Sequence, residues 1–151
     1  MKKLQKPKHL REGSRIAIVA PAFSFDMQAF ENGRQFLESR YKVKTLVLPS
    51  IGEKQAYFAG TDQRRAEEFA QWLLDPTVDA ILAARGGYGC TRIYETVLKK
   101  MKTSKKKIPP KIVGGFSDLT IFLNGLLQNR NWVTFHCPHI VSRLFREPLK
   151  L

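Results

Sequence analysis

Residues Lys111 to Thr120 read KIVGGFSDLT: a short apolar run, two glycines, and a serine that directly precedes a helical pattern. This order predicts a buried strand that turns sharply into a helix. At such a turn the hydroxyl of Ser117 stands clear of the sheet edge, and the first N–H groups of the helix lack partners within it. Ser117 is therefore a candidate nucleophile. The alternative role is a helix N-cap, which serine also favours, and Leu119 stands where a hydrolase elbow carries glycine.

The rest of the chain alternates between strand and helix patterns in the same way. Besides the strand before Ser117, strands are expected at Arg15 to Ala20, Tyr41 to Leu48, Val78 to Ala84 and Trp132 to Phe135. Helices are expected at Asp26 to Arg40, from Thr61 or Asp62 to Leu74, at about Thr91 to Lys100 and from Asp118 to about Gln128. The alternation predicts an α/β fold with an open, mostly parallel sheet and helices on both faces.

Length and composition favour one domain: the chain has 151 residues, of which 43% are hydrophobic. The net charge of +13 raises the question of nucleic-acid binding, but no zinc-finger, RRM or KH pattern is present. Much of the excess charge lies in a leading stretch and one loop, both expected to be solvated. These lysines are Lys2, Lys3, Lys6 and Lys8, and Lys99, Lys100, Lys102, Lys105, Lys106 and Lys107. We therefore consider nucleic acid an unlikely partner.

Several other partners and compartments are also disfavoured. The two cysteines have no metal-ligand spacing, and no apolar stretch approaches 18 residues. No signal-peptide core follows Met1. We expect a cytoplasmic protein with no membrane partner, no metal and no cofactor.

A second turn, RGGYG at Arg85 to Gly89, can offer backbone N–H groups to an anion. It matches neither the G-x-G-x-x-G dinucleotide spacing nor the Walker pattern, and a tight strand-to-helix connection is the alternative. Both turns follow strands, and ligands of open parallel sheets bind at the carboxyl ends of the strands. A non-catalytic domain that binds phosphate or nucleic acid is therefore a rival interpretation to a hydrolase.

The segment TFHCPH offers further candidates in His136, Cys137 and His139. Either histidine could act as a base or a metal ligand, but no cluster of carboxylates lies nearby. Cys137 could act as a nucleophile, but we expect it to pack as a small residue before Pro138, and we expect His136 to order a loop.

Four segments in this order resemble the N-terminal half of the LD-carboxypeptidases, a serine peptidase family that includes muramoyl-tetrapeptide carboxypeptidases and microcin C self-immunity proteins. They are RIAIVAPA (Arg15 to Ala22), FAGTDQRRAEEF (Phe58 to Phe69), ILAARGGYGCTRI (Ile81 to Ile93) and GGFSDLT (Gly114 to Thr120). The resemblance implies a flavodoxin-like fold, also called class I glutamine amidotransferase-like, for residues 1–151. It also implies that Ser117 is the nucleophile and that the backbone N–H groups of Gly86 and Asp118 form the oxyanion hole.

The family's glutamate and histidine, which complete its triad, lie in a C-terminal domain that nothing in this chain matches. We therefore expect a fragment that is nearly inactive alone, with exposed apolar surface where the missing domain would dock. The resemblance further implies a murein peptide substrate, release of terminal D-alanine in cell-wall recycling, and a homodimer for the full-length protein. Action on a microcin C-like antibiotic is the alternative within the family. The chain departs from the family's His-Gly-Pro at His136, Cys137 and Pro138, where the thiol either narrows the site or replaces a turn residue.

Overall fold

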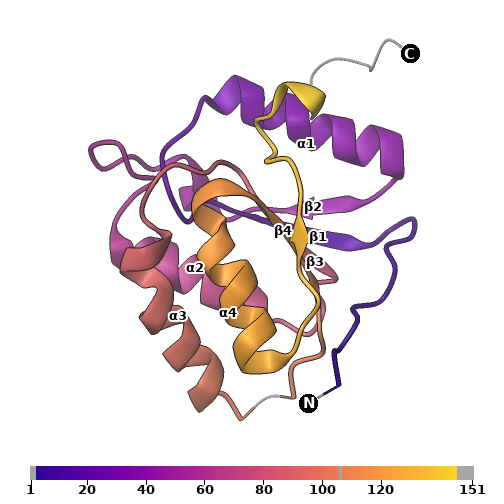
Figure 1. Cartoon of the computed structure of the whole chain (residues 1–151). Helices are drawn as coiled ribbons and strands as arrows, with labels where there is room; N and C mark the ends of the chain where they lie inside the picture. The colour runs from indigo at the N-terminus through magenta and orange to yellow at the C-terminus, as the bar shows by residue number, and fades with distance from the viewer. Residues whose placement is uncertain (1–2, 106, 146–151) are drawn as a thin grey trace.

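The computed structural model describes residues 3–105 and 107–145, and its sheet contains five strands that pair in parallel (Figure 1). The spatial order is β2-β1-β3-β4-β5, the order of flavodoxin-like doubly wound sheets. The predicted open parallel sheet is confirmed. The strands are β1 (Arg15–Val19), β2 (Lys44–Leu46), β3 (Ala80–Ala83), β4 (Ile112–Gly115) and β5 (Phe135–His136).

Helices cover both faces of the sheet, but unequally: α1 lies on one face, and α2, α3 and α4 lie together on the other (Figure 1). Phe30 and Leu37 of α1 pack on β1 in one apolar core, which the later segment around Ile140 completes. The other three helices enclose a second core that includes Phe69 and Phe122, whose ring centroids are 4.5 Å apart. The helices are α1 (Met27–Tyr41), α2 (Asp62–Leu74), α3 (Cys90–Thr103) and α4 (Thr120–Arg130).

The predicted helices are present, and local caps explain several of their ends. The side chains of Asp26 and Thr61 accept hydrogen bonds from backbone N–H groups at the starts of α1 and α2. Lys42 adopts a left-handed conformation (φ 54°) that ends α1. The strand predicted from Tyr41 is therefore wrong at its start, because Tyr41 is still helical and β2 begins only at Lys44.

The region after β4 also differs from the prediction. A short 3₁₀ turn, η2 (Ser117–Leu119), precedes α4, so the α-helix begins at Thr120 rather than at Asp118. Trp132 is not in the last strand; it forms an isolated bridge with Gln5 of the leading segment. The leading segment thus contacts the fold through its backbone while its lysines Lys3, Lys6 and Lys8 stay exposed, as predicted. Lys99, Lys100, Lys102, Lys105 and Lys107 are exposed too, whereas Lys2 and Lys106 lie outside the described residues.

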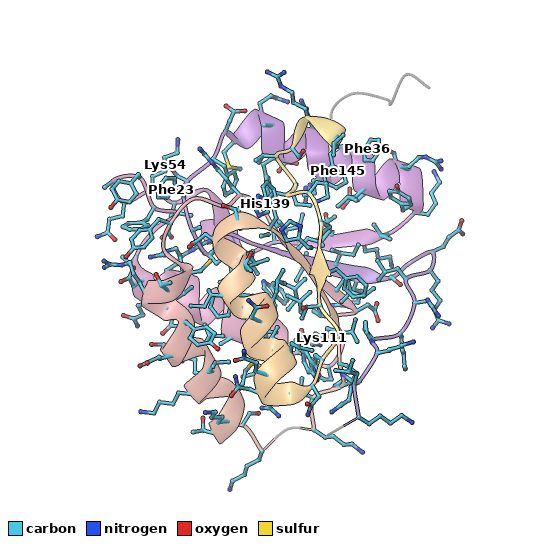
Figure 2. All side chains as sticks on the ribbon, in the orientation of Figure 1. Phe23, Phe36, Lys54, Lys111, His139 and Phe145 are labelled. Atoms are coloured by element: carbon cyan, nitrogen blue, oxygen red, sulfur yellow. The ribbon has the colours of Figure 1, made fainter. Side chains whose placement is uncertain are left out.

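Lys111 is a buried lysine that directly precedes β4. It lies at the opposite edge of the sheet from His139 (Figure 2). Its Nζ donates hydrogen bonds to the carbonyl oxygens of Asp75 and Val78, the latter at 2.8 Å. Burial lowers the pKa of Lys111 to about 8. Lys111 therefore ties the end of α2 to β4 at the amino edge of the sheet.

Candidate active site

Ser117 occupies a strained turn at the carboxyl end of β4. Its φ of 58° lies in the left-handed region, which residues other than glycine seldom adopt. The preceding Gly115 has φ 156°, and a Cβ there would overlap the side chain of Leu119. The Ser117 hydroxyl is exposed and forms no hydrogen bond with residues 3–105 or 107–145. The N-cap interpretation of this serine is therefore wrong, because its side chain caps no helix end.

The RGGYG turn meets Ser117 through Gly86. A Cβ built on Gly86 would lie 3.0 Å from Cβ and 3.3 Å from Oγ of Ser117, and 2.8 Å from Cε1 of His139. Only glycine allows this approach of the two turns. The N–H groups of Gly86 and Asp118 have no acceptor within the described part of the chain. Two backbone donors beside the serine are therefore available to a ligand.

A pocket of about 360 Å³ opens in front of Ser117. Two aromatic residues, Phe23 and Phe116, line it together with small and aliphatic residues. A Cβ on Gly87, which has φ 121°, would overlap the Phe23 ring, so this glycine lets the ring close the pocket wall. The lining residues are Phe23, Arg85, Gly86, Gly87, Phe116, Ser117, His139, Val141 and Ser142. None of the exposed lysines is among them.

Several aromatic side chains near this pocket are exposed. Tyr57 is 55% exposed, Tyr88 46% and Phe116 40%. Tyr57 and Tyr88 both contact the ring of Phe58, which in turn contacts Phe23 of the pocket. The pocket is thus continuous with an apolar surface.

The carboxylate of Asp118 links the two turns. Its Oδ2 accepts a hydrogen bond of 2.8 Å from the backbone N–H of Cys90, the first residue of α3. The helix has no other side-chain cap, since Gly89 stands at its N-cap position. Burial raises the pKa of the Cys90 thiol, with the Asp118 carboxylate adding to the effect, so Cys90 is not a thiolate nucleophile.

His139 is buried, with 4% of its surface exposed, and lies against the residue that precedes Ser117. Its Nε2 is 3.0 Å from the carbonyl oxygen and 3.2 Å from the backbone nitrogen of Phe116. The two rings stack with centroids 4.2 Å apart. Burial lowers the pKa of His139 to about 4, so the ring is neutral at pH 7. His139 therefore holds the Phe116 peptide rather than carrying charge, a role for which the sequence contained no signal.

His136 and Cys137, which precede Pro138 and His139, do not line the pocket. His136 is exposed in β5 and touches the Phe116 ring at a centroid distance of 5.9 Å. Its predicted role in ordering a loop is wrong, because it belongs to a strand. Cys137 is half-buried and packs over Gly114, where a Cβ would lie 2.7 Å from its sulfur. Its predicted packing role is confirmed, and it does not narrow the pocket, whose lining excludes it.

Within residues 3–105 and 107–145, no three histidine, cysteine or acidic side chains gather closely enough to hold a metal ion. None of the helices in the same ranges combines the length and the apolar content needed to cross a bilayer.

Comparison with known proteins connects this geometry to a family. The sequence profile described as "LD-carboxypeptidase N-terminal domain" matches residues 16–137. A Bacillus subtilis protein named "probable murein peptide carboxypeptidase" is 32% identical over 133 residues, which are 88% of this chain and 40% of that protein. The microcin C7 self-immunity protein of Escherichia coli is 26% identical over 134 residues, 85% of this chain and 36% of its own length.

A solved structure agrees with these sequence matches. The muramoyltetrapeptide carboxypeptidase from Oxalobacter formigenes superposes with a TM-score of 0.72 at 26% identity, covering 91% of this chain and 44% of that one. The chain thus spans less than half the length of each of these three proteins.

Proposed function

The chain belongs to the LD-carboxypeptidase family, and from this premise we propose that residues 1–151 are the nucleophile-bearing domain of a cytoplasmic serine peptidase. The peptidase would cleave an L,D peptide bond and release the terminal D-alanine of murein tetrapeptides. The observation that carries the proposal is the exposed Ser117 at φ 58°, beside the N–H groups of Gly86 and Asp118, for which the described residues offer no acceptor. A strained serine next to backbone donors is the arrangement that acyl transfer requires.

The proposed reaction proceeds in two steps. Ser117 Oγ attacks the carbonyl carbon, its proton passes to a general base, and the oxyanion that forms accepts hydrogen bonds from Gly86 and Asp118. The tetrahedral intermediate then breaks its C–N bond, and the base returns the proton to the amine of the leaving D-alanine. Water hydrolyses the acyl-enzyme through the same groups and restores the serine.

The general base is not His139. Its pKa of about 4 makes it a weak base at pH 7, and its Nε2 already faces the backbone of Phe116. We propose that the histidine and the glutamate that orients it belong to a C-terminal domain absent from this chain. The 151-residue chain alone should then be nearly inactive, because loss of the base costs several orders of magnitude in rate.

The test is release of D-alanine from a disaccharide tetrapeptide by the complete gene product. Ser117→Ala should abolish release, whereas Ser39→Ala, which changes an exposed serine of α1, should leave it intact. Undiminished release by the Ser117 variant would remove this serine from the mechanism. The native mass of the same preparation tests whether the complete protein is a homodimer.

A second candidate substrate, which the same serine would attack, is a processed microcin C-like conjugate. The match to the microcin C7 self-immunity protein favours including it. Turnover of the murein peptide and of the conjugate, measured side by side with the complete protein, distinguishes the two. Faster turnover of the conjugate would assign the protein to antibiotic immunity rather than wall recycling.

A further inference from the structure

We propose that Arg85 binds the free carboxylate of the residue that the enzyme releases, and so restricts cleavage to the end of a peptide. The identity of the ligand rests on the function proposed above; the cation site rests on the structure. Arg85 directly precedes Gly86 and lines the same pocket as Ser117. Neither the motifs nor the comparisons assign a role to its side chain.

Arg85 differs from Arg64, Arg65 and Arg92 because its guanidinium has no carboxylate partner among the residues that the structure describes. Its Nη1 donates one hydrogen bond of 2.9 Å to the carbonyl oxygen of Ser24, and its guanidinium carbon lies 5.9 Å from the centre of the Phe23 ring. It forms no ion pair with residues 3–105 or 107–145. The neighbouring arginines do: Arg64 pairs with Glu68, and Arg65 and Arg92 pair with Asp62.

The side chains that line the pocket favour a negatively charged ligand. No aspartate or glutamate is among its lining residues, and the only ionisable side chain there besides Arg85 is His139, which is neutral at pH 7. A guanidinium has five N–H donors in a planar fork that matches a carboxylate, and only one is used here. The Ser24 contact therefore holds the arginine in place while leaving donors for a ligand.

The shared pocket of Arg85 and Ser117 suits a substrate whose carboxylate lies close to the carbonyl under attack. In a carboxypeptidase substrate, the carboxylate lies one residue beyond the carbonyl that is attacked, about 3.5 Å along an extended chain. Arg85 is one residue from Gly86, where a Cβ would lie 3.0 Å from Cβ of Ser117. In a longer peptide, a neutral amide would occupy the same place and gain little from the charge.

The experiment is an NMR titration of the 151-residue chain with N-acetyl-D-alanine and, separately, with its neutral amide. The free acid should shift the amide signals of Gly86 and Gly87 and bind about tenfold more tightly than the amide, a factor typical of one charge-assisted hydrogen bond. Arg85→Gln should remove this preference. Arg40→Gln should keep it, since Arg40 is also exposed and also lies over an aromatic ring, that of Tyr41.

Three results would overturn the inference: equal binding of acid and amide, a preference that survives Arg85→Gln, or no binding of either compound at millimolar concentration. Tighter binding of inorganic phosphate than of N-acetyl-D-alanine would also overturn it, in favour of a phosphate site. Ser117→Ala should retain the carboxylate preference. The two proposals can therefore fail separately: loss of D-alanine release tests Ser117, and loss of the preference tests Arg85.

Discussion

The Asp118 carboxylate accepts a hydrogen bond of 2.8 Å from the backbone N–H of Cys90, 28 residues away in the sequence. This bond joins the turn that carries Ser117 to the first residue of α3, which follows the RGGYG turn. One side chain thus caps a helix and fixes the relative position of the two turns that form the pocket.

Replacing Asp118 with alanine should therefore lower the free energy of unfolding by about 1 kcal/mol, the usual cost of a lost helix cap. Asp118→Asn should recover much of this, because asparagine also accepts from a backbone N–H. Urea unfolding measures both. The matched control is Asp26→Ala, which removes the cap of α1 (2.7 Å to Ala29 N) at similar cost. If Asp118→Ala left the NMR signals of Gly86 and Gly87 unmoved, the bond would not hold the turns together.

Gly86→Ala should destabilise the chain by about 1–3 kcal/mol, the range for an overpacked site. The new methyl would lie 2.8 Å from His139 and 3.0 Å from Ser117, so one of them must move. Gly52→Ala is the control, because its nearest neighbour is the flexible side chain of Met27 at 3.2 Å. Thermal unfolding compares the two variants, and equal melting temperatures would contradict the close approach at Gly86.

Ser117→Gly should raise the free energy of unfolding by about 0.5–1 kcal/mol, since relief of the left-handed strain exceeds the added freedom of the unfolded chain. The same substitution at Ser39, in the last turn of α1, should instead lower it by up to about 0.5 kcal/mol, because glycine forms helices less readily than serine. Urea unfolding of both variants checks the opposite signs. A loss of stability at Ser117 would mean that its backbone is not strained.

His139 should make stability depend on pH. Its folded pKa of about 4 lies below the ordinary 6.5, so its stabilising contribution is complete above pH 6.5 and is lost as the pH falls towards 4. His139→Leu should therefore be destabilised at pH 7, and its deficit relative to the parent chain should shrink by about 2 kcal/mol at pH 5. Urea unfolding of both proteins at the two pH values gives this difference, and a constant deficit would contradict it.

The comparison with His139→Leu is necessary because Glu68 changes the free energy of unfolding with pH in the opposite direction. Burial raises the pKa of this carboxyl from 4.5 to about 7, so its contribution is present at low pH and declines as the pH rises between these values. The parent chain alone would show the sum of both effects. Subtracting the free energy of unfolding of the His139 variant from that of the parent chain at each pH cancels the contribution of Glu68.

Much of the fold followed from local pattern. The apolar run before Gly114 and Gly115 predicted β4, and a cap at Thr61 or Asp62 predicted the start of α2, where the structure selects Thr61. Strand periodicity and helix caps are properties of a few neighbouring residues. Strand ends were less accurate. Tyr41 fits a strand pattern, yet it completes α1 because the left-handed Lys42 ends the helix one residue later.

Local pattern also located Ser117 and the RGGYG turn at strand ends, because glycines and a serine before a helix mark such turns wherever they occur. Only the folded sheet brought the two turns together, buried His139 against Phe116 and joined Asp118 to Cys90. It also left Arg85 without an ion pair among the described residues. These contacts join residues from different strands and loops. They depend on parallel pairing, which collects the carboxyl ends of β3, β4 and β5 at one edge, and no short stretch of sequence encodes that arrangement.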